Sequence, residues 1–164
     1  MKHLYFAYGS NLNLGQMAHR CSGAKPVARG YIPNMELFFY SVASIRKVEG
    51  AKVWGGIWEI NKKHLLALDR YEGFPHLYRR EMINVYLPDK KVSVNSIVYI
   101  MNIPDDLEYP PSDVYYDCIY QGYSDFRLQK KPLRIARSKS IESGIEDYIP
   151  RADVAKRNRK AVAK

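Results

Sequence analysis

Cysteine and histidine are scarce in this chain, and neither is spaced for metal binding. Of 164 residues only two are cysteines, Cys21 and Cys118, and the four histidines show no paired ligand spacing. Secreted disulfide scaffolds and structural zinc sites carry denser, more regularly spaced sets of these residues. We therefore expect two free thiols, no metal site, and the reducing environment of the cytoplasm.

Long apolar runs and nucleotide-binding loops are also absent from the sequence. No segment reaches the roughly 20 apolar residues of a membrane-spanning helix, and the first residues, MKHLYFAYGS, lack the apolar core of a signal peptide. No P-loop or dinucleotide fingerprint occurs, and Ser10 does not stand in a nucleophile elbow. The expectation is a cytoplasmic protein with no membrane partner.

Basic residues outnumber acidic ones, giving a net charge of +9, but the excess is concentrated near the C-terminus. Residues 151–164, RADVAKRNRKAVAK, contain six Lys or Arg and one Asp, which is +5 of the total and leaves +4 for the other 150 residues. No nucleic-acid recognition motif accompanies this charge. We expect one domain over residues 1–150, a basic, flexible tail over 151–164, and no specific nucleic-acid partner.

The hydrophobic pattern predicts strands in the first 100 residues and helices toward the end. Strand-like runs occupy residues 3–8, 26–32, 35–41, 53–60, 78–87 and 92–101, with a bend at Pro33-Asn34 and a strand or loop over 44–52. Gly55-Gly56 indicates a bulge or a close approach to the backbone. This order favours one α+β domain built around a closed or strongly bent sheet.

Capping residues mark the expected helices. Asn13 is a candidate N-cap for a short helix ending at Cys21, and Asn61 for a helix that Gly73 would terminate. Ser112 would cap a helix ending at Gly122, and the basic stretch after it is helical in pattern but is interrupted by Pro132.

The turn Tyr8-Gly9-Ser10-Asn11 ends the first predicted strand abruptly. A strand that stops there exposes backbone N–H groups, and glycine lets a ligand approach them closely. Such a group of donors binds a carboxylate or a developing oxyanion, and the side chains of Tyr8, Ser10 and Asn11 add hydrogen-bonding groups. An ordinary turn is the alternative interpretation.

Asp69 and Glu72 both fall in the last turn of the helix that Asn61 begins. The exposed carbonyls there disfavour an acid by about 0.3–1 kcal/mol, which raises a pKa by only about 0.2–0.7 units. A glutamate titrating near neutrality therefore needs burial as well. Glu72 is a candidate general acid–base; the alternatives are exposure to solvent or pairing with an arginine, namely Arg70, Arg79 or Arg80.

In combination, LYFAYGSNL, VARGYIPNMELFFY, VWGGIWEINKKHLLALDRYEG and PPSDVYYDCIYQGY, in this order, resemble the γ-glutamylcyclotransferase family. The resemblance covers most of residues 4–123 and implies an α+β fold, a small mixed β-barrel flanked by short helices, with no metal or cofactor. It places the catalytic acid at Glu72 and a substrate contact at Tyr115, with Tyr116 the alternative. It implies a substrate-cradling loop formed by Tyr5, Phe6, Ala7, Tyr8, Gly9, Ser10 and Asn11. A homodimer is expected only by analogy.

The family reaction converts a γ-glutamyl amide to 5-oxoproline and a free amine without water. Glu72 would take a proton from the substrate's α-ammonium and return one to the leaving amine. The Gly9–Asn11 donors would hold the substrate carboxylate, the oxyanion, or both, in a dry pocket walled by tyrosines. Two alternatives stay open: the same chemistry on a γ-glutamyl-amine or other specialised conjugate, or a non-enzymatic binding module whose basic tail attracts nucleic acid.

Overall fold

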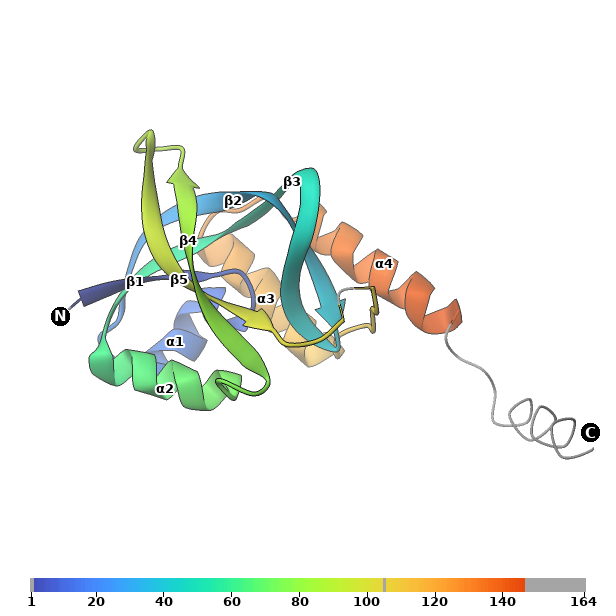
Figure 1. The fold of residues 1–164 in the computed structure, drawn as a ribbon, viewed down its shortest axis with the longest axis horizontal. Coiled ribbons are helices and arrows are strands. Elements are labelled where there is room, and N and C mark those ends of the chain that lie inside the picture. Colours follow the sequence, from blue (N-terminus) through green and yellow to red (C-terminus); the bar gives the residue numbers. More distant parts are fainter. Residues whose placement is uncertain (1, 105, 147–164) are drawn as a thin grey trace, which may run out of the picture.

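The computed structural model describes residues 2–104 and 106–146, and the predicted tail at 151–164 lies outside them (Figure 1). These residues contain five strands, one short 3₁₀ helix and four α-helices. In chain order the elements are β1 (Lys2–Ala7), the short 3₁₀ helix η1 (Ser10–Leu12), α1 (Leu14–Arg20), β2 (Lys25–Tyr40), β3 (Val42–Asn61), α2 (Lys62–Glu72), β4 (Tyr78–Leu87), β5 (Val92–Met101), α3 (Asp113–Asp125) and α4 (Lys131–Glu146).

The strands close into a barrel in the order β1-β3-β2-β4-β5. All neighbours are antiparallel except β1 and β5, which close the barrel as a parallel pair with Tyr5 opposite Ile97. The contacts between β2 and β4 and between β1 and β5 are short, each with one paired position, Tyr31 opposite Tyr86 and Tyr5 opposite Ile97. In Figure 1, α1 and α2 lie side by side and α4 lies beside the β2–β3 hairpin, while α3 packs against η1. The expected α+β fold with a small mixed barrel is confirmed.

Strands β2 and β3 are longer than the sequence pattern predicts. The expected bend at Pro33-Asn34 is present as an irregularity within β2, where the pairing with β3 shifts register between Pro33 and Met35. Asn34 adopts a positive φ of 56°, and its side chain accepts a hydrogen bond from the backbone N–H of Gly50 at 3.0 Å. The segment 44–52 therefore belongs to β3, and its residues 44–47 and Lys52 pair with β2 even though most of its side chains are polar.

Fully buried apolar side chains join the barrel to the helices. Leu68 of α2, Ile119 of α3 and Leu133 of α4 each have 0% exposure, as do Phe6, Phe39, Ile57 and Val98 of the barrel. Burying a side chain of this size contributes about 1.5–3 kcal/mol. Helices α2, α3 and α4 thus each bury an apolar side chain in the same hydrophobic core as the barrel strands.

The Gly55-Gly56 pair marks a close approach, as predicted. A Cβ at Gly55 would lie 2.2 Å from the carbonyl oxygen of Ala7, and one at Gly56 would lie 2.3 Å from the ring of Phe126. Both distances are shorter than any van der Waals contact. The two glycines allow β1 and the chain after α3 to pack directly on β3.

The predicted N-caps are confirmed. Asn13 accepts from the N–H of Gln16 at 3.0 Å, Asn61 from that of His64 at 3.0 Å, and Ser112 from that of Tyr115 at 3.3 Å. The end of α2 is also as expected, because Gly73 follows it with a left-handed φ of 64°.

Two helix boundaries were predicted wrongly. Helix α3 continues through Gly122 to Asp125, because this glycine provides a close approach rather than a stop: a Cβ there would lie 2.5 Å from Cβ of Leu12. Helix α4 begins at Lys131 with Pro132 in its first turn. Proline is tolerated there because the first N–H groups of a helix have no intrahelical acceptor.

Cys21 and Cys118 are both free thiols. Over residues 2–104 and 106–146, no group of three or more His, Cys, Asp or Glu is placed to hold a metal ion. None of the helices in this part of the chain is long and apolar enough to cross a membrane.

Candidate active site

A cavity of about 190 Å³ opens where the end of β1, the start of β3, the end of α2 and the first turn of α3 meet. This is smaller than the roughly 300–1,000 Å³ usual for drug-sized ligands, so it suits a group of amino-acid size. Tyrosine rings and one carboxyl group dominate its wall. The lining residues are Tyr5, Tyr8, Gly9, Ser10, Asn11, Val42, Ala43, Tyr71, Glu72, Leu77, Tyr78, Tyr99 and Tyr115.

Glu72 is brought to the cavity by the C-terminus of α2. Its side chain is half-buried, and its Oε1 accepts a hydrogen bond from Nδ2 of Asn11 at 3.0 Å, across 61 residues of sequence. The arginines weighed as partners lie elsewhere: Arg79 pairs with Glu81, Arg80 approaches Asp69, and Arg70 is exposed.

The pKa of Glu72 is raised from its ordinary value of 4.5 to about 7. Burial is the largest cause, because it disfavours the charged form; the positive charge of Arg20 and the hydrogen bond from Asn11 act in the opposite direction. A carboxyl group with a pKa near the working pH can both accept and donate a proton. This property needs burial, since a helix terminus alone is too weak.

The Gly9–Asn11 turn lines the same cavity. Ser10 begins η1, and the first N–H groups of a helix have no partner inside it. Across the part of the chain that the structure describes, the N–H groups of Gly9, Ser10 and Asn11 have no acceptor. Glu72 and these donors thus share one small space.

Tyr115 and Tyr116 point to different surroundings. The backbone N–H of Ala43 donates to the Tyr115 hydroxyl at 3.1 Å, which leaves the hydroxyl proton free to donate into the cavity. Burial raises the pKa of Tyr115, so its hydroxyl stays protonated. Tyr116 packs against Phe39 and Tyr120 instead, with ring centroids 6.4 and 6.3 Å away.

Three further tyrosines of the wall are held by hydrogen bonds to the barrel or to α2. Tyr8 donates to the carbonyl of Tyr99 at 2.6 Å, Tyr99 to Asp69 at 2.7 Å, and Tyr78 to the carbonyl of Ala43 at 2.8 Å. Burial raises the pKa of each of these hydroxyl groups. These hydroxyl groups are therefore neutral, and the burial that raises their pKa values also raises the pKa of a carboxyl group facing them.

Two residues of the predicted substrate-cradling loop do not line the cavity. Phe6 and Ala7 are 0% and 1% exposed and belong to the hydrophobic core. A Cβ at Gly55 would clash with both the Phe6 ring and the Ala7 carbonyl, which places these two residues against β3. The other five members of the loop, Tyr5, Tyr8, Gly9, Ser10 and Asn11, do line it.

Sequence reasoning missed several residues around the site. Arg20, in the last turn of α1, donates to Oδ1 of Asn11 at 2.5 Å and to Oγ of Ser10 at 3.3 Å. The sequence feature that could have indicated Arg20 is its position at the end of the short helix that follows the Gly-Ser-Asn turn. Tyr71 could have been noticed beside Glu72, but no local pattern pointed to Val42, Ala43, Leu77, Tyr78 or Tyr99.

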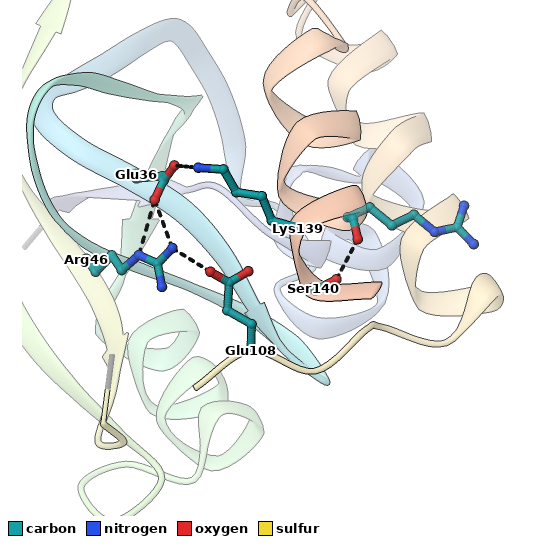
Figure 2. A network of polar contacts seen from close by, with 6 residues as sticks. Glu36, Arg46, Glu108, Lys139 and Ser140 are labelled. Carbon is teal, nitrogen blue, oxygen red and sulfur yellow. Dashed lines mark hydrogen bonds and ion pairs between the residues drawn. The ribbon is translucent and has the colours of Figure 1, made fainter. Parts of the chain in front are cut away.

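A charged network holds the segment that leads into α3 (Figure 2). Arg46 of β3 donates to Glu36 of β2 at 2.9 Å and to Glu108 at 2.5 Å, and Lys139 of α4 also contacts Glu36. Buried ion pairs add little net stability, so we interpret the network as positional. It fixes Glu108 four residues before Ser112, the N-cap of the helix that carries Tyr115.

The fold and the cavity define a small closed-barrel protein with one partly buried acid, Glu72, in a tyrosine-walled site. The chain belongs to the family described as gamma-glutamyl cyclotransferase, AIG2-like, whose sequence profile matches residues 5–118. The gamma-glutamylcyclotransferases of Bos taurus and Homo sapiens are each 33% identical to it over 82 residues, covering 43% of this chain. The match spans less than half of these relatives, 44% of each.

Solved structures agree with this family assignment. One described as a gamma-glutamyl cyclotransferase superposes with a TM-score of 0.73 at 25% identity, over 84% of this chain and 88% of its own. An uncharacterized protein from Homo sapiens superposes with a TM-score of 0.72 at 26% identity, over 92% of both chains. YkqA from Bacillus subtilis, at 18% identity and a TM-score of 0.69 over 85% of this chain and 54% of its own, shares the fold.

Proposed function

We propose that this protein is a γ-glutamylcyclotransferase, which closes the γ-glutamyl group of an amide into 5-oxoproline and releases an amine. The observation that carries the proposal is the position of Glu72, whose carboxyl group, with a pKa of about 7, shares a cavity with the donors of the Gly9–Asn11 turn. In this reaction the substrate's α-nitrogen bonds to the carbonyl carbon of its own γ-amide, and that carbonyl carbon then loses the amide nitrogen. No water and no cofactor enters the balance.

Proton transfer is the task assigned to Glu72. Its carboxylate takes a proton from the α-ammonium group, which frees the nitrogen lone pair for attack. The resulting carboxylic acid then donates this proton to the leaving nitrogen, and the carboxyl group returns to its starting state. The second excess proton of the ring nitrogen also passes to the departing amine, which leaves as an ammonium ion. Because attack is intramolecular, holding the substrate chain curled supplies much of the rate acceleration.

Charge develops on the γ-carbonyl oxygen during attack. The N–H groups of Gly9, Ser10 and Asn11 and the hydroxyl group of Tyr115 are donors that can stabilise it without rearrangement. The same donors suit the substrate's α-carboxylate. The tyrosine wall excludes water, which favours ring closure over hydrolysis.

A substrate panel tests the proposal. The full-length protein is incubated with γ-glutamyl dipeptides, with γ-glutamyl amines and with an α-glutamyl dipeptide, and 5-oxoproline is measured by mass spectrometry. We expect product from γ-glutamyl compounds only, because the α-linked isomer cannot form the five-membered lactam by releasing its amine. Product from the amines alone would indicate a specialised conjugate as substrate.

An empty panel would contradict the proposal and favour the binding-module alternative. That alternative makes its own prediction: nucleic-acid binding that persists at moderate salt and is lost when residues 151–164 are deleted.

The pH dependence of kcat/KM follows from the pKa of Glu72. Since the free enzyme must carry the carboxylate, kcat/KM is expected to rise with pH through about 7. It should fall again where the substrate's α-ammonium loses its proton, at about 8 for an ordinary α-amino group. Initial rates between pH 5 and 10 measure both limbs. An ascending limb near the ordinary glutamate value would show that Glu72 is not the base.

A further inference from the structure

Arg20 contacts three sides of the site without lining the cavity. Its guanidinium group donates to Oδ1 of Asn11 at 2.5 Å and to Oγ of Ser10 at 3.3 Å, and it lies over the ring of Tyr71, 3.5 Å from the centroid. Tyr71 is 45% exposed and forms part of the cavity wall. Arg20 thus contacts both the Gly9–Asn11 turn and α2, the helix that carries Glu72, from outside the cavity.

The contact with Arg20 determines which way the Asn11 amide faces. Arginine can only donate, so it requires the carbonyl oxygen of the amide. The amide nitrogen must then face Glu72 and the hydroxyl group of Tyr5, to which it donates at 3.0 and 2.9 Å. The reversed amide would set donor against donor at Arg20 and acceptor against acceptor at Glu72. Asn11 is only 3% exposed, so water cannot compensate for such a mismatch.

We propose that Arg20 is a positioning residue for proton transfer: by fixing the Asn11 amide, it holds Oε1 of Glu72 as a hydrogen-bond acceptor and leaves Oε2 as the oxygen that exchanges the proton. The inference rests on the proposed function. Arg20 acts through Asn11 and needs no contact with the substrate.

Arg20 differs from the tyrosines that face Glu72 because it carries a charge that acts on the carboxyl group. The groups that face the carboxyl group from β1, β4, β5 and α3 are neutral hydroxyls, those of Tyr5, Tyr8, Tyr78, Tyr99 and Tyr115. From α2 the cavity receives Tyr71. Among the residues the structure describes, Arg20 is the cation whose charge lowers the pKa of Glu72. Removing Arg20 should therefore raise the pKa of Glu72 further, because less positive charge then opposes the effect of burial.

Kinetics of Arg20 variants test the inference. For Arg20→Met we expect kcat to fall roughly tenfold, KM to stay near the wild-type value, and the ascending limb of the pH profile to move to higher pH. Arg20→Lys keeps the charge but not the planar fork, so the limb should stay in place while kcat recovers only in part. Arg70→Met, which removes the same charge from the exposed end of α2, is the matched control and should behave as wild type.

Two kinetic outcomes would overturn the inference. If Arg20→Met raised KM alone, Arg20 would be a substrate contact; if it left kcat and the limb unchanged, it would have no role. A double-mutant cycle tests the path through Asn11. In an Asn11→Ala background, Arg20→Met should reduce kcat little further, whereas a second full reduction would show that Arg20 acts independently of Asn11.

Direct titration separates this inference from the proposed function. Carbon-13 labelling of glutamate carboxyl groups, with Glu72 assigned by its loss in Glu72→Gln, gives the pKa of Glu72 with no substrate present. We expect a value near 7 in the wild-type protein and a higher one in Arg20→Met. An unchanged value would reject the role of Arg20. A raised value together with an empty substrate panel would reject only the cyclotransferase reaction.

Discussion

Replacing Glu72 by glutamine is expected to reduce the rate of 5-oxoproline formation by about a thousandfold, within the range that general acid–base catalysis contributes. Glutamine has nearly the same shape, and its carbonyl oxygen can still accept the hydrogen bond from Asn11. It cannot take up or release a proton at neutral pH. Single-turnover or steady-state assays with a reactive γ-glutamyl substrate measure the loss, and KM should change little.

The same substitution should stabilise the fold. Because the carboxyl group is harder to ionise in the folded protein than in the unfolded chain, Glu72 costs stability as pH rises from about 4.5 to about 7. The difference, at about 1.4 kcal/mol per pKa unit, is about 3 kcal/mol above pH 7. Glu72→Gln should thus have the higher melting temperature at pH 8, and the gain should disappear near pH 4.5. A higher melting temperature would also show that the loss of activity in Glu72→Gln is not caused by unfolding.

Asp69 provides the matched acid for comparison. It lies one turn earlier on α2 and accepts from the Tyr99 hydroxyl at 2.7 Å, so it faces the outside of the tyrosine wall. Asp69→Asn can keep this bond through its amide oxygen, and we expect less than a tenfold effect. Full activity in Glu72→Gln, or a greater loss in Asp69→Asn, would contradict the assignment of the general base.

Substituting valine for Gly122 is expected to destabilise the protein by ~3 kcal/mol, the cost of severe overpacking. A Cβ at this position would lie 2.5 Å from Cβ of Leu12 and 2.7 Å from the backbone nitrogen of Asn13. Backbone cannot yield as a flexible side chain does, so α3 must move away from η1. This movement would separate Tyr115 from the Gly9–Asn11 turn and raise KM for γ-glutamyl substrates. Urea unfolding and substrate kinetics measure the two effects.

Gly15→Ala is the control for this substitution. Gly15 is an exposed glycine of α1, and the nearest group to an added Cβ is the side-chain oxygen of Asn13 at 3.2 Å. Alanine favours a helix over glycine by about 1 kcal/mol, so stability should be unchanged or slightly higher. If Gly122→Val were as stable as wild type, the packing of α3 on η1 would not be what positions the site.

Local signals accounted for much of the fold. The oxygens of Asn13, Asn61 and Ser112 cap helices because each needs only an N–H group two or three residues ahead. The predicted helix end at Gly122 and the predicted interruption at Pro132 were wrong because glycine and proline each occur in more than one structural role. Glycine can end a helix or admit a neighbouring backbone, and proline can break a helix or begin one. Sequence spacing does not distinguish these uses.

The residues of the candidate site were only partly accessible to sequence reasoning. Glu72 and the Gly9–Asn11 turn carried recognisable chemistry, whereas Phe6 and Ala7 were included in the loop although both belong to the core. Tyr78 and Tyr99 reach the cavity from adjacent strands, and which face of a barrel strand points inward depends on register. Register is set by pairing partners far away along the chain.

By itself, the sequence determined where α1, α2 and α3 begin, which runs are strands, and that Asp69 and Glu72 lie at a helix end, since these properties depend on side chains within a few residues. Only the tertiary structure decided that Glu72 lies partly buried beside Asn11, 61 residues away, with Arg20 in contact with Asn11, and therefore that its pKa is raised. The physical reason is that desolvation and charge act over a few ångströms of space. Folding brings Glu72, Asn11 and Arg20 together, and the spacing of these residues along the chain does not reveal their proximity.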